Sequence, residues 1–221
     1  DDLGLSLPKT TDDFYNVLKA FYNNDCNKNG ISDDEIPLIG HNGWKGSVAD
    51  YLLNSFIYIN GANLNAENGK IYAPYITNEY REGLRYLNRL YKEGLLSPLS
   101  FSQGQNELRA ILSDPSDEPN IIGAFVGHPS PLFGSDGVWR VMEYAALPAM
   151  VGPEGVNWTP NDGWFASYNA QITKDCKNPR LAFRIMDTIS KEDMSLSMRE
   201  GVQGLDWEYT NEGVPSHVIE G

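Results

Sequence analysis

The sequence predicts an α/β fold in which helix exceeds strand. Segments of about 10–15 residues with apolar side chains at every third or fourth position alternate with short, continuously apolar runs, which is the pattern of helices alternating with buried strands. The 221 residues are 41% hydrophobic and 21% charged, an ordinary globular composition. The chain is therefore long enough to bury a sizeable core, in one large domain or two small ones.

The first predicted helix follows Thr10. Asp13 stands three residues later, as in a capping box with Asp in place of Glu. Apolar residues then recur at helical spacing over about two turns. They are Phe14, Val17, Leu18 and Phe21. This amphipathic helix leads directly into the most informative stretch of the chain.

Residues 25–37 read Asp-Cys-Asn-Lys-Asn-Gly-Ile-Ser-Asp-Asp-Glu-Ile-Pro. Oxygen-bearing side chains alternate at Asp25, Asn27 and Asn29, and Gly30 stands where a tight loop needs positive φ. Helix–loop–helix calcium loops supply oxygens at positions one, three, five, seven and nine, with Gly at six. The spacing therefore predicts a calcium loop directly after the helix, in which the metal connects the end of the helix to the following segment.

The second half of the loop departs from this pattern, because the twelfth position is Ile36 instead of Glu. A carboxylate before it must close the shell, and the sequence leaves Asp34 and Glu35 as alternatives. The competing interpretation is a solvated turn without metal, since Asn, Asp and Gly dominate turns in general.

The middle of the chain continues with three predicted units. Residues 47–58 form a largely apolar, buried helix, and Asn68-Gly69 is a strong hairpin signal. Thr77 caps the clearest helix of the chain, which Gly94 ends in the C′ position. Its predicted core face consists of Tyr80, Leu84, Leu87, Leu90 and Tyr91.

The last part of the chain alternates in the same way. We predict helices at 105–112, 178–189 and 192–199, the second opened by Asn178-Pro179. Buried strands are expected at 121–126 and 143–148, with a loop at 152–163 and an extended segment at 164–173.

Charge and cysteine content exclude several classes of protein. With 30 acidic and 17 basic residues the net charge is −13, which argues against nucleic acid and against an anionic membrane surface as partner. No apolar stretch approaches the ~18 residues that a membrane span needs. Cys26 and Cys176 are too few for a disulfide framework and are interpreted as free, buried thiols.

Four segments together resemble one protein family. They are residues 10–37, 72–101, 178–189 and 200–209, the last containing Gly-Leu-Asp-Trp-Glu-Tyr. They resemble family 1 extracellular solute-binding proteins of ABC importers, in the branch of alginate- and oligosaccharide-binding lipoproteins. The resemblance implies a periplasmic-binding-protein-like type II fold, whose two lobes close over a sugar, and members are considerably longer than this chain.

The resemblance also implies a division of the chain and a set of metal ligands. Residues 1–167 correspond to the second lobe, with the calcium loop at 25–35, and residues 168–221 to the hinge crossing and the helices that return to the first lobe. Carried over position by position, the ligands of a structural Ca²⁺ are Asp25, Asn27, Asn29, the carbonyl of Ile31, Asp33 and Asp34. An extra acid, Glu35, leaves the last ligand open.

Sugar sites combine aromatic platforms with amides and carboxylates. The Gly-, Asn- and Asp-rich surroundings of three tryptophans favour them as platforms, and the resemblance places Tyr168 and Asn169 at the crossing between lobes. The candidate ligand-binding residues are Trp44, Trp164, Tyr168, Asn169 and Trp207. Core packing is the competing explanation for each tryptophan, and it is favoured for Trp139 and Trp158.

We therefore expect a binding protein and no enzyme: an extracellular carbohydrate-binding protein that delivers its solute to the permease subunits of an ABC importer. It is expected to be a monomer at the cell surface or in the periplasm, held to the membrane only by a lipid anchor outside this sequence. One alternative is a calcium-stabilised fragment of a carbohydrate-active enzyme, although the three histidines lack metal spacing. A calcium-stabilised adhesin has only the loop in its favour.

Overall fold

A computed structural model describes residues 3–31, 33–43, 45–60, 64–113, 120–133, 140, 143–159, 170–211 and 213–217. The chain forms two compact units, Asp1–Gly163 and Trp164–Gly221. Each is described by itself. Helices outweigh strands in both, as the sequence predicts.

The first unit begins with helix α1, Thr11–Asn23. The predicted capping box is present: the Thr10 hydroxyl accepts from the Asp13 amide at 3.0 Å, and the Asp13 carboxylate accepts from the Thr10 amide at 3.0 Å. These bonds satisfy donors that every helix start leaves unpaired. Phe14, Tyr15 and Leu18 form the buried face of the helix.

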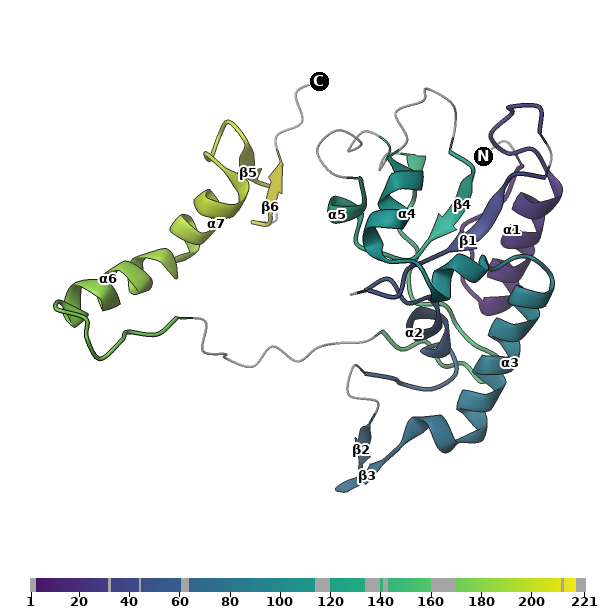
Figure 1. The fold of residues 1–221 in the computed structure, drawn as a ribbon, viewed down its shortest axis with the longest axis horizontal. Coiled ribbons are helices and arrows are strands. Elements are labelled where there is room, and N and C mark those ends of the chain that lie inside the picture. Colours follow the sequence, from purple (N-terminus) through teal and green to yellow (C-terminus); the bar gives the residue numbers. More distant parts are fainter. Residues whose placement is uncertain are drawn as a thin grey trace. The chain divides into compact units, whose positions relative to one another are not determined.

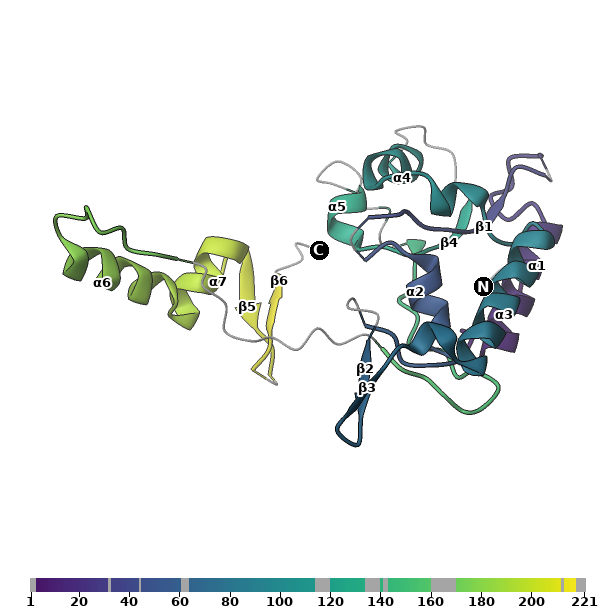
Figure 2. The same cartoon turned by 60° about the horizontal axis from the view of Figure 1, so that its bottom comes forward.

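Two parallel strands form the centre of the first unit. Strand β1, Ile36–Ile39, pairs with β4, Ile122–Phe125. Successive side chains of a strand point to opposite faces, and Leu38 accordingly packs in one hydrophobic cluster and Ile39 in another. In both views the pair lies between α1 on one side and α4 with α5 on the other (Figures 1 and 2).

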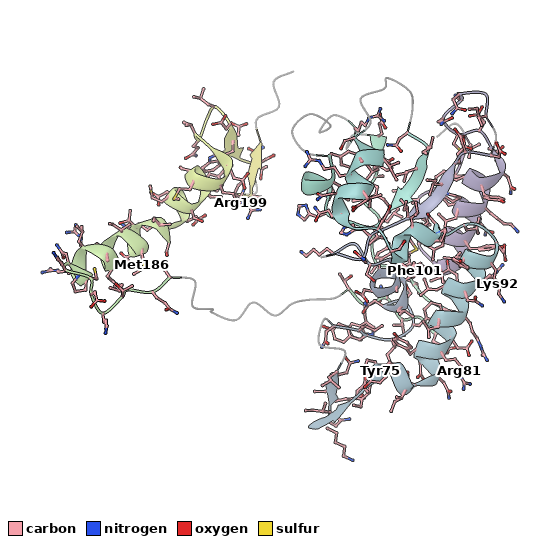
Figure 3. The ribbon with its side chains drawn as sticks, viewed as in Figure 1. Tyr75, Arg81, Lys92, Phe101, Met186 and Arg199 are labelled. Carbon is pink, nitrogen blue, oxygen red and sulfur yellow. The ribbon has the colours of Figure 1, made fainter. Side chains whose placement is uncertain are left out.

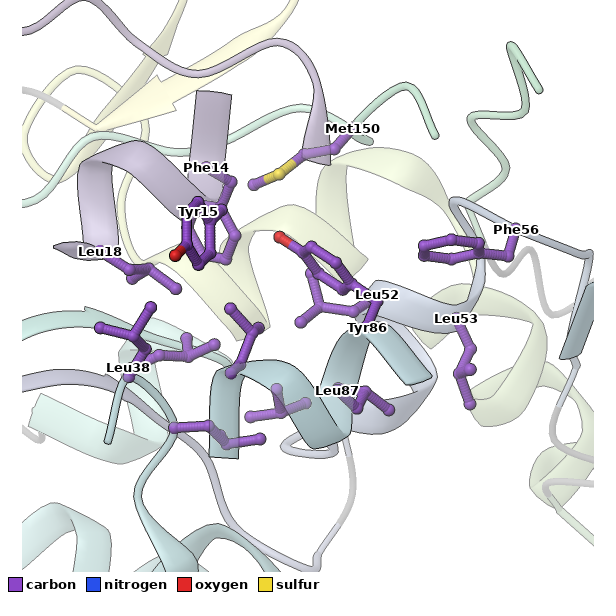
Figure 4. Packing of buried hydrophobic residues seen from close by; sticks show 14 of the residues in the cluster. Phe14, Tyr15, Leu18, Leu38, Leu52, Leu53, Phe56, Tyr86, Leu87 and Met150 are labelled. Carbon is purple, nitrogen blue, oxygen red and sulfur yellow. The ribbon is translucent and has the colours of Figure 1, made fainter. Parts of the chain in front are cut away.

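The larger cluster joins α1, β1, α2 (Val48–Leu53) and α3 (Asn78–Lys92). Figure 4 shows Tyr86 and Leu87 of α3 facing Leu52 of α2 and Phe14 of α1. The predicted helix α3 and its cap Thr77 are confirmed, and Gly94 follows it with φ +74°.

The buried face of α3 differs from the predicted one. It consists of Gly83, Tyr86, Leu87 and Leu90, whereas Leu84 and Tyr91 are about half exposed. Gly83 lies where α3 approaches α2 closely, since a Cβ on Gly83 would come within 2.4 Å of the Leu53 side chain. The close approach of α2 thus turns the core-facing side by about one position, and Arg81 and Lys92 extend from the other side (Figure 3).

The smaller cluster lies under α4, Gln105–Leu112, and α5, Pro129–Phe133. Two 3-10 helices, Pro74–Ile76 and Pro98–Phe101, connect neighbouring segments. The predicted hairpin is confirmed as β2, Asn65–Glu67, and β3, Lys70–Tyr72. Its turn residues Asn68 and Gly69 have φ +50° and +75°, the conformation that makes Asn-Gly a hairpin signal.

The predicted helix at 47–58 is too long. The structure ends α2 at Leu53, because the Asn54 side chain takes over the next hydrogen bonds. Its Nδ2 donates to the Asp50 carbonyl at 2.7 Å, and its Oδ1 accepts from the Ile59 amide at 3.0 Å. A buried carboxamide therefore replaces the continuing helix with a compact turn.

The strand expected at 143–148 is also wrong, whereas β1 was not predicted. Residues 144–150 form neither helix nor strand, and the ladder contacts of this region among the described residues begin only at Val151, which exchanges backbone bonds with Lys9 and Thr11 at 2.9 and 3.0 Å. A strand requires partner groups as well as an apolar sequence. Ile36–Ile39 has such a partner in β4.

The second unit contains α6, Pro179–Ile189, and α7, Glu192–Glu200, followed by the antiparallel pair β5, Trp207–Tyr209, and β6, Pro215–His217. Asn178 caps α6 and Gly201 ends α7 with φ +97°, as predicted. No residue of α6 or α7 is buried, and the apolar side chains of α6 are about half exposed. Met186 and Arg199 mark the two helices in Figure 3.

Candidate functional site

The loop after α1 wraps around the side chains that were predicted to hold calcium. Asp25 accepts from the amides of Asn29 and Gly30 at 3.1 and 2.9 Å. The Oδ1 of Asn29 accepts from the Ile31 amide at 2.7 Å. Gly30 has φ +87°, as expected for the tight point of the loop. Backbone amides thus turn the loop oxygens toward its inside.

Two carboxylates extend into the loop from its C-terminal side. Glu35 reaches back so that its Oε1 accepts from the Cys26 amide at 2.7 Å, and Asp34 Oδ2 accepts from Asn29 Nδ2 at 2.7 Å. The second oxygen of each, Asp34 Oδ1 and Glu35 Oε2, is buried without a hydrogen-bond partner. Buried carboxylate oxygens require a compensating partner, and a hard cation with oxygen ligands would provide it.

The loop offers calcium a mixture of carboxylate and amide oxygens. The side-chain oxygens come from both carboxylates and amides, and among the described residues no three His, Cys, Asp or Glu side chains gather into a metal site by themselves. A shell would therefore need Asn27, Asn29 and a backbone carbonyl beside the acids. The negative surroundings are also visible at Cys26, where partial desolvation and the nearby Glu35 and Asp25 raise the pKa of the thiol.

Both cysteines are free thiols, and neither is buried. Cys26 is exposed beside the loop and Cys176 is half-buried in the second unit. The expectation of buried thiols is therefore wrong. Cys26 lies within the turn at residues 25–30, on the surface of the unit, and therefore outside the hydrophobic core.

A second feature is the edge where both parallel strands end. Residues 40–46 follow β1, and residues 126–128 follow β4. Buried side chains fix the first of these loops: the Ser100 hydroxyl accepts from the Gly40 amide at 3.0 Å, and Gln103 Nε2 donates to the Gly40 carbonyl at 2.7 Å. In open α/β sheets, ligands bind outside the carboxyl ends of the strands. This edge is therefore the candidate binding site.

A hollow of about 2080 Å³ reaches this edge within the first unit. Gly43 and Lys45 line it from the loop after β1, and Gly127 lines it from the segment after β4. Asn60 and Thr159 contribute from segments distant in sequence. The remaining lining is largely apolar and includes Phe14, Phe21 and Leu38.

Next to Thr159 lies an aromatic pair that the sequence analysis did not select. The indole of Trp158 is 57% exposed and packs edge-on against the ring of Tyr58, with 5.8 Å between centroids. Its backbone amide donates to the Asn54 carbonyl at 3.0 Å. An exposed indole on a fixed backbone differs from the packed tryptophan that we expected here. Its Asn-Trp-Thr-Pro-Asn surroundings were the available signal.

Of the five predicted ligand-binding residues, the structure describes Trp207. Trp44, Trp164, Tyr168 and Asn169 lie outside the described residues, as does Trp139. Trp207 is 2% exposed, its Nε1 donates to the Gly201 carbonyl at 3.0 Å, and its ring contacts Tyr209 edge-on. Its indole thus packs inside the second unit, and a role in stacking on a ligand stays a prediction.

Comparison with known proteins identifies the family. Over 215 residues, or 92% of this chain, the sequence is 31% identical to the fructooligosaccharide ABC transporter substrate-binding protein FusA of Streptococcus pneumoniae. This chain belongs to the family of ABC-transporter substrate-binding proteins. No protein-family model matches it.

Two further relatives come from Bacillus subtilis. The lipoprotein LipO is 38% identical over 101 residues, which are 43% of this chain and 19% of LipO. The polygalacturonan/rhamnogalacturonan-binding protein YtcQ is 26% identical over 223 residues, which are 93% of this chain and 41% of YtcQ. The chain covers 37% of FusA. It therefore spans about two-fifths of the length of the relatives that it matches nearly throughout.

Solved structures agree with the sequence comparison. The complex of FusA with kestose superimposes with a TM-score of 0.69 at 27% identity, over 98% of this chain and 44% of FusA. A FusA EF-hand mutant in complex with fructo-nystose gives a TM-score of 0.66 at 27% identity. The α/β fold is thus periplasmic-binding-protein-like, and the chain contains part of it. Within the described part, no helix has the length and hydrophobicity that a membrane crossing requires.

Proposed function

We propose that this chain is part of an extracellular binding protein that captures an oligosaccharide and delivers it to the permease subunits of an ABC importer. The relation to FusA over 92% of the chain is the observation that carries the proposal. FusA is a substrate-binding protein and YtcQ a polysaccharide-binding protein, which also favours binding without turnover. The lipoprotein among them supports attachment of the intact protein to the cell surface by a lipid anchor.

The two units support a division of the chain between two lobes. We assign the first unit to the second lobe and the second unit to the crossing and to helices of the first lobe. The second unit leaves apolar side chains of α6 uncovered: Leu181, Phe183 and Ile185 are 51%, 61% and 53% exposed. Apolar helix faces of this kind are normally covered, and the part of a full-length relative that this chain lacks would cover them.

The ligand site in this proposal is the carboxyl edge of β1 and β4. Its aromatic members are Trp44, which stands between Gly43 and Lys45 in sequence, and the exposed Trp158. Trp164, Tyr168 and Asn169, which the family resemblance places at the crossing between lobes, remain proposed ligand-binding residues. Aromatic rings would cover apolar sugar faces, while the amide of Asn60 and the hydroxyl of Thr159 supply polar groups in the same hollow.

Calcium belongs to the proposal as a structural ion. We assign it to the loop at 25–35, with Asp25, Asn27, Asn29, the Ile31 carbonyl, Asp33 and Asp34 as ligands. The unpartnered Asp34 Oδ1 and Glu35 Oε2 support a cation there, and both remain candidates for the closing ligand. Bound calcium would connect the end of α1 to the start of β1.

Titration calorimetry of the intact, monomeric protein with kestose and with polygalacturonan fragments tests the function. Saturable binding of at least one of them is expected. A thermal shift should accompany it, since a ligand at about 100 times its Kd stabilises by about 2.7 kcal/mol. Chromatography of the recovered sugar provides the control: an unchanged oligosaccharide supports a binding protein, and cleavage products contradict it.

A further inference from the structure

His41 is the most buried polar group at the carboxyl edge of the strands. Its side chain is 1% exposed, and it lies in the loop of residues 40–46 directly after β1. The ring nitrogens of a buried histidine normally have hydrogen-bond partners. The role proposed above for this edge uses aromatic and amide groups and leaves His41 without a function.

The loop is built around the imidazole ring. The Nδ1 atom accepts from the Gly43 amide at 3.0 Å. The His41 amide donates to the Gly46 carbonyl at 2.9 Å, and the Gly46 amide donates to the Gly43 carbonyl at 3.2 Å. A Cβ atom on Gly46 would lie 2.2 Å from two ring atoms, and one on Gly43 would lie 2.9 Å from Nδ1. Only glycine allows the backbone this close to the ring.

The other end of the ring points toward the second strand. A Cβ atom on Gly127, two residues after β4, would lie 3.6 Å from His41 Nε2. The imidazole therefore lies between the loops that follow the two parallel strands. Any change in its position or protonation acts on both sides of the candidate binding edge.

We propose that His41 is a positioning residue for ligand binding, whose neutral imidazole holds the loop of residues 40–46 in its binding conformation. The inference rests on the proposed function, since it concerns the same edge. Because Nδ1 accepts a hydrogen bond, the proton of the neutral ring is on Nε2. A second proton would have to be placed on Nδ1, where it would face the Gly43 amide donor and break the bond.

The surroundings of the ring favour the neutral form. Burial lowers the pKa of His41 below its ordinary value near 6.5. The turn at residues 97–104, which anchors Gly40, carries no titratable side chain. The charged or titratable residues of the other adjoining segments are Lys45, Asp50, Tyr51 and His128, and Lys45 and His128 have interactions of their own. Loss of the neutral form is therefore expected only in acid.

Two substitutions separate the hydrogen bond from the volume of the ring. His41→Asn keeps an acceptor that can reach the amide two residues on, as Asn does in turns, but it cannot be protonated. His41→Phe keeps a ring and removes the acceptor. Affinity for kestose, a neutral sugar that does not titrate, is measured by calorimetry from about pH 7.5 to about pH 4.5, a window that spans the titration of histidine.

The wild-type protein is expected to bind about tenfold more weakly once His41 is protonated, the effect of one lost hydrogen bond in a buried loop. His41→Phe should bind about tenfold more weakly than wild type at neutral pH. His41→Asn should keep most of the neutral affinity and lose the decline in acid. The proposal is overturned if His41→Phe binds as tightly as wild type, or if His41→Asn shows the same acid decline.

A ligand-free measurement keeps the role of His41 apart from the proposed function. The nitrogen chemical shifts of the His41 ring and the amide shift of Gly43 are followed by NMR through the same pH range. An unprotonated Nδ1 at neutral pH, with a Gly43 shift that titrates together with the ring, supports the hold on the loop. A proton on Nδ1 at neutral pH overturns it, whether or not a sugar binds.

Discussion

Removal of calcium is expected to lower the melting temperature of the first unit by several degrees. The reason lies in the two carboxylate oxygens, Asp34 Oδ1 and Glu35 Oε2, that are buried without a partner. A buried unsatisfied group costs about 1–3 kcal/mol, so the pair costs about 2–6 kcal/mol when no cation is present. Calcium at about 100 times its Kd stabilises by about 2.7 kcal/mol, within this range.

The expected shift follows from the size of the chain. For proteins of about 150–250 residues, 1 kcal/mol corresponds to about 2–4 °C in melting temperature. The difference between excess calcium and excess chelator should therefore be roughly 5–11 °C. Differential scanning calorimetry measures it, and elemental analysis of the purified protein reports bound metal.

Three variants identify the closing ligand. Asp34→Asn and Glu35→Gln each replace one of the two candidate carboxylates, and the one that provides the ligand should abolish most of the calcium-dependent shift. Glu67→Gln, on the exposed hairpin, is the matched control and should keep the full shift. Identical melting curves with calcium and with chelator, together with the absence of metal from the purified protein, would refute the reasoning.

Three further predictions concern sugar binding, the first helix and pH. Trp164→Ala should weaken sugar binding by about thirtyfold, the effect of losing an anchor of about 2 kcal/mol, whereas Trp139→Ala should change it little; calorimetry with the best sugar decides, and equal affinity of Trp164→Ala and wild type contradicts it. Thr10→Ala should destabilise the first unit by about 1 kcal/mol in urea titration because it removes the side-chain cap of α1, and an unchanged midpoint would contradict that role. The pKa of Glu93 is lowered, mainly because the Tyr15 hydroxyl donates to its carboxylate at 2.6 Å. The contribution of Glu93 to stability is therefore present above its unfolded pKa and disappears as the pH falls through the lower folded pKa. Glu93→Gln should flatten this part of the melting-temperature profile in acid, and a profile parallel to that of the wild type would contradict the prediction.

Local patterns located the loop at 25–35 and several element ends. The Asp25–Gly30 spacing, the Thr10 cap and the Asn68-Gly69 turn each depend on residues that are neighbours in sequence, and the structure has the capping box and the turn as predicted. Local patterns did not locate the carboxyl edge of β1 and β4. That edge joins residues near 40 to residues near 126, and no periodicity within either segment indicates the other.

Burial of individual aromatic residues was also beyond the sequence. Trp158 and Trp207 both stand in polar segments, yet one is 57% and the other 2% exposed. The difference arises from contacts that the composition of the flanking residues does not specify: Trp207 donates to the Gly201 carbonyl and packs on Tyr209, whereas Trp158 packs edge-on against Tyr58, which is far away in sequence. Composition of the flanking residues carries little information about such contacts.

The sequence by itself determined several helix starts and ends, the tight turns and the order of donor groups in the loop at 25–35. These depend on interactions across three to ten residues, which a linear pattern contains. Only the tertiary structure decided that Ile36–Ile39 is a strand, that 143–148 is not, and that His41 lies between two loops. Strand pairing and burial depend on backbone partners and close contacts supplied from far along the chain, and these exist only once the chain has folded.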